Sequence, residues 1–309
     1  MRRSKGRQEP RSFRDSMEPD LVCLEEIKMP GPESVLSLSL CSQDYSAVYP
    51  GMIRYTIYVR SGDEERAIFR TNTYEYSPQD PLRAENVARE RLTAIQQELT
   101  GTSAGNLRAV TTDERLPDTT RGADLVVIEG SPRADGNCSI FTEWAAEAAR
   151  NAGMTAQVIY PHDMEIHPCI GCYQCYNTGT CVFADDMTGI IDALRRCKVL
   201  AVTSPVYTNT VSGSLKILID RCQAYHAERM LFGGPSGQQG ALFVVAGRRG
   251  QENFTCVTRV VRAFFRNLGF APDGQLLIDG TDEIRDIRKI PNLREQAGAI
   301  VRGALGRRP

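Results

Sequence analysis

From about residue 122 to the carboxyl end, short apolar segments alternate with longer amphipathic ones. The short segments are rich in Val, Ile, Leu and Ala, which is typical of strands buried on both faces. Five strand–helix units of this kind predict a doubly wound α/β fold, a parallel sheet with helices on both faces. The strands are expected at 125–128, 156–159, 199–203, 242–246 and 275–278, and the helices near 141–148, 187–194, 215–222, 257–268 and 293–304.

Residues 20–118 follow a different rhythm, with a period of two. Leu36, Leu38 and Leu40 alternate with serines, and a second alternating run covers 53–59. Both patterns predict antiparallel strands with one buried face. A third strand is expected near 67–76 and a covering helix over 84–99. The prediction is a small α+β domain, and docking, dimerisation and structural elaboration remain open as its role.

Composition also predicts an amino-terminal tail, and the pattern of elements sets the bounds of the α/β domain. Residues 1–19 are basic and poor in apolar side chains, so we expect a disordered tail, and Met17 is a possible true start. The α/β domain is expected to cover 119–309. Within it, residues 161–186 form a long loop.

Charge and hydropathy exclude several classes of partner. The chain of 309 residues carries 37 basic and 38 acidic side chains, so there is no electrostatic case for binding nucleic acid or an anionic membrane. No apolar run approaches the roughly 18 residues that span a bilayer. The basic start is not followed by an apolar segment, so no secretory signal is expected. We expect a cytoplasmic protein.

The loop after the first α/β strand resembles an anion site. It runs from Gly130 to Ser139 and is rich in glycine, hydroxyl and amide groups, and a helix follows it. The free N–H groups and the dipole of a helix start both favour phosphate. The loop is neither a Walker loop nor a dinucleotide Gly-x-Gly-x-x-Gly. An ordinary helix start, capped by Asn137 or Ser139, is the alternative.

Two further strand ends carry groups suited to a flat heterocycle. Residues 204–210 offer an aromatic ring with several hydrogen-bonding groups, and 246–250 offer glycines and two arginines. Arg248 and Arg249 would suit the charge of a reduced flavin, although both also fit a solvated loop. In a doubly wound sheet the ligand site lies at the carboxyl ends of the strands, where the strand order reverses.

Four of the ten cysteines fall within 13 residues, in the spacing C-x2-C-x2-C-x5-C. Zinc sites usually pair two C-x2-C knuckles across a longer loop, whereas successive x2 spacings resemble the ferredoxin run that wraps one cubane. No Asp, Glu, Lys or Arg lies between Glu165 and Asp185, and a loop of about 26 residues needs something to order it. A [4Fe–4S] cluster is favoured. Zinc and free or disulfide-forming thiols stay open.

These motifs together resemble the iron–sulfur flavoprotein family, within the flavodoxin-like, NADPH-dependent FMN reductase superfamily. The resemblance covers about 122–309 and also rests on Asp186-Met187, Lys216 and Asp220-Arg221. It implies a flavodoxin-like fold, FMN and one [4Fe–4S] cluster per subunit, and a homodimer or homotetramer. Cys138 departs from the Ser or Thr common in the family, which puts a side-chain contact to phosphate there in doubt.

The resemblance also implies a site. The expected flavin-binding residues are Ser131, Arg133, Asn137, Cys138, Ser139, Ser204, Pro205, Val206, Tyr207, Thr208, Asn209 and Gly247, and the expected cluster ligands are Cys169, Cys172, Cys175 and Cys181.

The predicted function is an electron relay between a one-electron donor such as ferredoxin, the cluster and FMN. This relay needs no general acid, base or nucleophile, so no catalytic side chain is assigned. Two alternatives remain: an NAD(P)H-dependent FMN or quinone reductase with structural cysteines, and a zinc-ordered interaction module. The physiological acceptor and the direction of electron flow are not predicted.

Overall fold

The computed structural model describes residues 19–30, 35–101 and 122–307. They form two compact units. Of the described residues, unit 1 takes in 19–30, 35–101 and Cys172–Thr178, and unit 2 takes in 122–171 and 179–307. The sequence had assigned the whole loop 161–186 to the α/β domain, whereas its middle packs with the amino-terminal unit. The predicted tail, apart from Pro19, and the predicted boundary near 118 lie outside the described residues.

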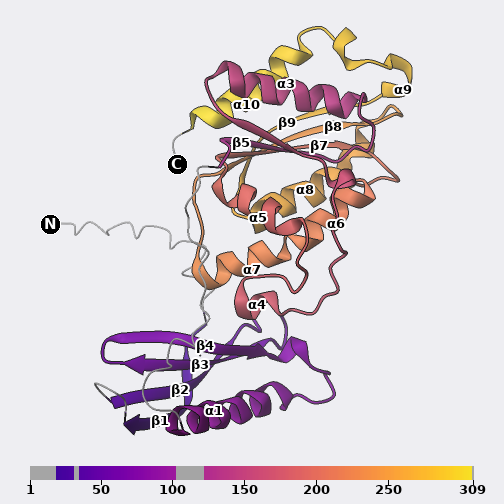
Figure 1. The fold of residues 1–309 in the computed structure, drawn as a ribbon. Coiled ribbons are helices and arrows are strands. Elements are labelled where there is room, and N and C mark those ends of the chain that lie inside the picture. The colour runs from indigo at the N-terminus through magenta and orange to yellow at the C-terminus, as the bar shows by residue number, and fades with distance from the viewer. Residues whose placement is uncertain (1–18, 31–34, 102–121, 308–309) are drawn as a thin grey trace, which may run out of the picture. The chain divides into compact units, whose positions relative to one another are not determined.

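Unit 1 contains a four-stranded antiparallel sheet in the order β1-β2-β3-β4 (Figure 1). Helix α1 packs on it, with Ala88, Leu92 and Ile95 against Leu38, Leu40 and Ile57. The alternating runs are confirmed as strands and the helix is confirmed, whereas β1 was not predicted. The elements are β1 (Val22–Pro30), β2 (Val35–Asp44), β3 (Ile53–Ser61), β4 (Glu64–Asn72), the 3₁₀ turn η1 (Thr73–Glu75), α1 (Arg83–Gly101) and α4 (Cys175–Thr178).

Unit 2 is built on a five-stranded parallel sheet in the order β6-β5-β7-β8-β9. All five predicted strands are present, and the flavodoxin-like, doubly wound fold is confirmed. The order reverses between β5 and β7, because the chain adds β6 on one side of β5 and the later strands on the other. The strands are β5 (Leu125–Glu129), β6 (Ala156–Ile159), β7 (Val199–Pro205), β8 (Gln239–Val245) and β9 (Ala271–Ile278).

Helices cover both faces of this sheet, as Figure 1 shows. One apolar layer holds α3 and α10 against the sheet, and the other holds α5, α6, α7 and α8. The long apolar stripe from Val257 to Leu268 packs in the second layer. The helices are α3 (Asn137–Asn151), α5 (Met187–Arg196), α6 (Gly213–Arg221), α7 (Gln223–Phe232), α8 (Thr255–Asn267), α9 (Thr281–Ile284) and α10 (Leu293–Gly306), with short 3₁₀ turns η2 (Pro161–Asp163), η3 (Gln251–Phe254) and η4 (Ile287–Lys289).

Within the described ranges, none of the helices combines the length and the apolar character that crossing a bilayer requires.

Candidate functional site

A cavity of about 620 Å³ opens at the carboxyl edge of the parallel sheet, within unit 2. It lies between the loops that follow β5, β7, β8 and β9, which is where a doubly wound sheet places its ligand. Hydroxyl, amide and backbone groups dominate its lining. The lining residues are Ser131, Arg133, Gly136, Asn137, Cys138, Pro205, Val206, Tyr207, Thr208, Asn209, Val245, Ala246, Gly247, Arg248, Asn253, Thr281 and Asp282.

The start of α3 faces this cavity without a side-chain cap. Gly136 is the N-cap residue and provides no side chain. Asn137 Oδ1 instead accepts a hydrogen bond from the Ile287 N–H at 3.1 Å, and Ser139 Oγ donates to the Arg133 carbonyl and to Glu129. The alternative of a helix capped by Asn137 or Ser139 is therefore wrong. The first-turn N–H groups are left for an anion.

Cys138 lies in the cavity lining, but its thiol packs into the apolar core. Its side chain is 2% exposed and packs in the core of the α3 layer. Burial, with a smaller contribution from Glu129, raises the pKa of this thiol. An anion at the helix start would thus meet the Cys138 backbone rather than its sulfur.

The turn that follows β7 forms one wall of the cavity, and its backbone is strained. Tyr207 N–H donates to the Thr210 carbonyl at 2.9 Å and Thr210 N–H returns a bond of 3.0 Å, so Thr208 and Asn209 are its two central residues. Their φ angles are 46° and 62°, the left-handed values that a type I′ turn requires. For a β-branched residue such as Thr208 this conformation is strained, and strain of this kind is common at ligand sites.

The glycine after β8 allows a close approach of backbone and side chain. A Cβ atom on Gly247 would lie 2.6 Å from the carboxylate oxygens of Asp282. The Asp282 N–H also donates to the Gly247 carbonyl at 3.1 Å. The loops after β8 and β9 therefore join at this point of the cavity wall.

Ten of the expected flavin-binding residues line the cavity. The other two do not: Ser204 is fully buried, with its hydroxyl donating to the Pro205 carbonyl at 2.9 Å, and Ser139 makes the bonds described above. Sequence reasoning missed Asn253, Thr281 and Asp282. The end of β9 was a usable signal for the last two, because that strand was predicted and its carboxyl end lies at the same edge.

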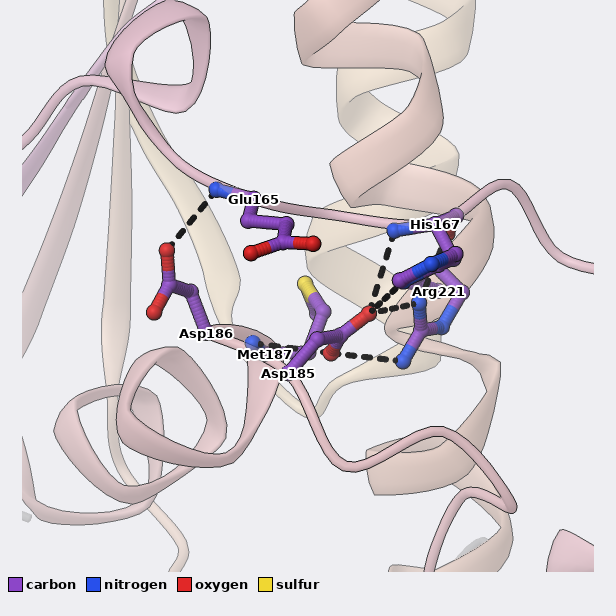
Figure 2. A network of polar contacts seen from close by, with 6 residues as sticks. All are labelled: Glu165, His167, Asp185, Asp186, Met187 and Arg221. Atoms are coloured by element: carbon purple, nitrogen blue, oxygen red, sulfur yellow. Dashed lines mark hydrogen bonds and ion pairs between the residues drawn. The ribbon is translucent and has the colours of Figure 1, made fainter.

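A buried ion pair closes the two ends of the cysteine loop (Figure 2). Both nitrogens of the Arg221 fork donate to Asp185, at 2.6 and 2.9 Å, and these side chains are 1% and 2% exposed. Arg221 also donates to the His167 carbonyl at 2.6 Å, and the His167 N–H donates to Asp185 at 3.0 Å. The pair therefore joins α6 to the beginning and the end of the loop.

A second set of bonds supports the same closure. The Glu165 N–H donates to Asp186 at 2.8 Å, and the Met187 N–H donates to Asp185 at 3.2 Å (Figure 2). Burial alone would raise the pKa of Asp185, but the bonds from Arg221 and His167 hold it well below its usual range. Asp185 is therefore ionised, and its contact with Arg221 at the ends of the loop is an ion pair between two charged groups.

The four cysteines of the loop are not joined by disulfide bonds. Cys169 is exposed and the other three are half-buried. Gly171, Tyr173 and Gly179 have positive φ angles, so the backbone turns sharply between the cysteines. Burial lowers the pKa of Arg221, but Asp185 and then Cys181 more than offset this, so that the Arg221 pKa is raised. A cation thus lies beside Cys181.

Four cysteines on a sharply turning loop supply the kind of sulfur ligand that holds an iron–sulfur cluster. In the described part of the chain, no three His, Cys, Asp or Glu side chains converge as they would around a single metal ion.

The comparisons with known proteins agree with this fold. The model of the family described as NADPH-dependent FMN reductase matches residues 123–282. An iron–sulfur flavoprotein of Methanocaldococcus jannaschii is 34% identical over 131 residues, 42% of this chain and 66% of that protein. An iron–sulfur flavoprotein of Archaeoglobus fulgidus is 30% identical over 173 residues, 54% of this chain and 76% of that protein. The chain thus spans just under two thirds of the first relative.

Among solved structures, an apo NADH:FMN oxidoreductase aligns with a TM-score of 0.43 and 14% identity, over 59% of this chain and 88% of that chain.

Fold and family model together make the parallel-sheet domain a flavodoxin-like domain of the FMN reductase class. The chain belongs to the NADPH-dependent FMN reductase family, and its relatives place it with the iron–sulfur flavoproteins. The resemblance noted in the sequence is confirmed. FMN also suits the cavity chemically. The uncapped start of α3 would bind a phosphate. The walls after β7 and β8 offer the Tyr207 ring, the Asn209 amide and a glycine backbone, at Gly247, that a flat ring could approach closely.

Proposed function

We propose that this protein is an iron–sulfur flavoprotein oxidoreductase that relays electrons between a one-electron donor such as ferredoxin, a [4Fe–4S] cluster and FMN. The single observation that carries the proposal is the cavity at the reversal of strand order, with the uncapped start of α3 at its wall. The four cysteines of the loop would hold the second redox centre.

The chain's own residues would hold FMN in two parts. The first-turn N–H groups of α3, with Ser131 and Arg133, would bind the phosphate. Tyr207 and the backbone of the Thr208-Asn209 turn would contact the ring, and Gly247 would let it approach the strand end. Arg248, which also lines the cavity, would supply positive charge where reduction adds negative charge.

Cys169, Cys172, Cys175 and Cys181 would ligate the cluster. Bound there, the cluster would supply one-electron transfer beside a flavin that exchanges one or two electrons. Arg221, fixed by Asp185, would place a positive charge next to the Cys181 ligand. Charge near a cluster and hydrogen bonds to its sulfurs are among the factors that set its potential.

One further observation favours a second candidate, a pyridine-nucleotide-dependent reductase. A cavity of about 800 Å³ adjoins the first and shares Arg133, Thr281 and Asp282 with it. Arg285 and Arg288 also line it. The phosphates of NADPH would find cations there, although Arg288 is paired with Asp286 at 3.0 Å. The description of the matched family names the same reductant.

The remaining parts of the proposal concern partners and location. We propose a homodimer or homotetramer in the cytoplasm, with a soluble redox protein as the electron donor.

Stopped-flow reduction of anaerobically purified protein distinguishes the two candidates. Reduced ferredoxin should bleach both the flavin and the broad absorption of the cluster, whereas NADPH alone should reduce the flavin slowly or not at all. Fast bleaching by NADPH without ferredoxin would favour the second candidate. A colourless protein with one bound zinc would contradict both.

A further inference from the structure

The middle of the cysteine loop belongs to unit 1. Cys172–Thr178 is separated in sequence from the rest of that unit, yet α4 packs against β4. Tyr176 is 3% and Asn177 is 6% exposed, so this segment is anchored by burial as well as by the chain. Two of the four cysteines, Cys172 and Cys175, lie in it.

Asn177 has a partner for both ends of its side-chain amide. Its Oδ1 accepts from Asn72 Nδ2 at 2.9 Å, and its Nδ2 donates to Glu75 Oε1 at 2.7 Å. Arg70 Nη1 donates to the Asn177 carbonyl at 3.2 Å. Asn72 is fully buried, so loss of this contact would leave polar groups without partners in a site away from water.

Asn72 and Glu75 are also fixed by contacts of their own, independent of the cysteine loop. They form the two sides of a capping box around η1, in which the Asn72 N–H donates to Glu75 Oε1 at 2.6 Å and the Tyr74 N–H donates to Asn72 Oδ1 at 3.0 Å. Such reciprocal bonds hold both side chains in one geometry. The two side chains that bind Asn177 are therefore held in fixed positions at the end of β4.

Aromatic contacts hold the residues on either side of Cys175. Tyr176 donates its hydroxyl to Tyr49 at 2.7 Å, with ring centroids 5.3 Å apart. Tyr173 packs edge-on against Tyr74 at 4.8 Å. Tyr173 also has a φ of 57°, a conformation costly for a residue of this size. The contact with Tyr74 helps to hold that conformation between the two cysteines.

We infer that the amino-terminal unit is the scaffold of the metal-binding loop, with Asn72 and Glu75 as positioning residues that hold Cys172 and Cys175 for the cluster. The inference rests on the proposed function and gives a role to a domain that the family match at 123–282 leaves out. It explains why a small sheet precedes the flavodoxin-like domain. A loop of this length, closed only at its ends, would leave its central ligands mobile.

The test compares iron retention in full-length variants prepared anaerobically. Glu75→Ala removes the acceptor of Asn177, Glu75→Gln keeps an acceptor oxygen, and Glu65→Ala makes the same truncation at an exposed pair with Arg60 in the same sheet. Iron should be lost to a chelator about 10- to 100-fold faster from Glu75→Ala. Glu75→Gln and Glu65→Ala should behave like wild type, and FMN content should be unchanged in all three.

Equal iron loss from Glu75→Ala and Glu65→Ala would overturn the inference. A second measurement does not depend on the cluster: hydrogen exchange of peptides covering 172–178 in the metal-stripped protein, with β2 and β3 as the folding control. Glu75→Ala should deprotect 172–178 and leave both strands protected, whereas unchanged protection of 172–178 would overturn the inference. Absence of iron from the wild type would contradict the proposed function, and the exchange result would still decide the role of unit 1.

Discussion

The cavity at the edge of the parallel sheet and the cysteine loop are built by different means. The cavity is formed by four loops at one edge of a parallel sheet, and most of its lining is backbone, amide and hydroxyl. The cysteine loop has no strand of its own; it is closed by Asp185 and Arg221 at its ends and held in unit 1 by Asn177. One site follows from the topology of the fold, and the other depends on a few buried polar side chains.

The largest expected effect separates the two sites. Cys172→Ala should lose the iron while FMN binding stays largely intact, because three thiolates hold a cubane poorly and none of the cysteines of the loop lines the cavity proposed for FMN. Iron, sulfide and flavin assays on the same sample give the answer. Cys256→Ala, at an exposed cysteine on α8, is the matched control and should keep both cofactors. Loss of iron and flavin together would mean that the sites are not separable.

The next effect concerns the closure of the loop. Arg221→Met leaves the Asp185 charge buried without its partner, and removing one member of a buried pair costs about 3–5 kcal/mol. Urea unfolding of the metal-stripped protein should show a loss of that size. Lys216→Met on the same helix breaks only an exposed pair with Asp220 and should cost less than about 1 kcal/mol.

If the two variants proved equally stable, the closure of the loop would not depend on the ion pair.

An acid titration tests the opposite edge of the parallel sheet, where Asp124 contacts Thr155 and Lys198 at the starts of the strands. Backbone hydrogen bonding from Thr155, against an opposing effect of burial, and the contact with Lys198 lower the Asp124 pKa from 3.8 to about 2. Because the folded value is the lower one, the carboxylate stabilises the fold above pH 4, and this contribution of about 2 kcal/mol is lost as the pH falls from 4 to 2. Urea unfolding at several pH values should show this loss, and Asp124→Asn should abolish it. An unchanged pH profile in that variant would exclude Asp124 as the cause.

The smallest effect tests the strained turn of the cavity. Asn tolerates left-handed φ angles better than Thr does, so Thr208→Asn should stabilise the flavin-free protein by up to about 1 kcal/mol. Thr210→Asn lies outside the left-handed region and should give no gain. Thermal unfolding of both variants makes the comparison, and equal shifts would show that Thr208 stores no strain.

The same contrast explains what the sequence predicted. Period and apolar content were enough for the five parallel strands and their order of alternation with helices, because burial on two faces leaves a clear pattern. The strand ends then indicated most of the cavity. Thr281 and Asp282, which line the cavity, were missed because no motif marks the turn after β9, although the end of that predicted strand already indicated this edge of the sheet.

Other elements gave no signal for physical reasons. In β1, a register shift between Cys23 and Glu25 breaks the period of two, and much of the strand is exposed. Helix α7 follows α6 after Cys222 alone; the predicted helix ended at that residue, and α7 was not predicted. The contact of Asn177 with Asn72 spans 105 residues and involves only side-chain amides, which no local pattern encodes.

The decisive measurement is the cofactor content of protein purified without oxygen. The account predicts one FMN with about four iron and four sulfide per chain, and an electron paramagnetic resonance signal after dithionite reduction. A chain that carries FMN but neither iron nor a signal, or that holds a single zinc, would contradict it.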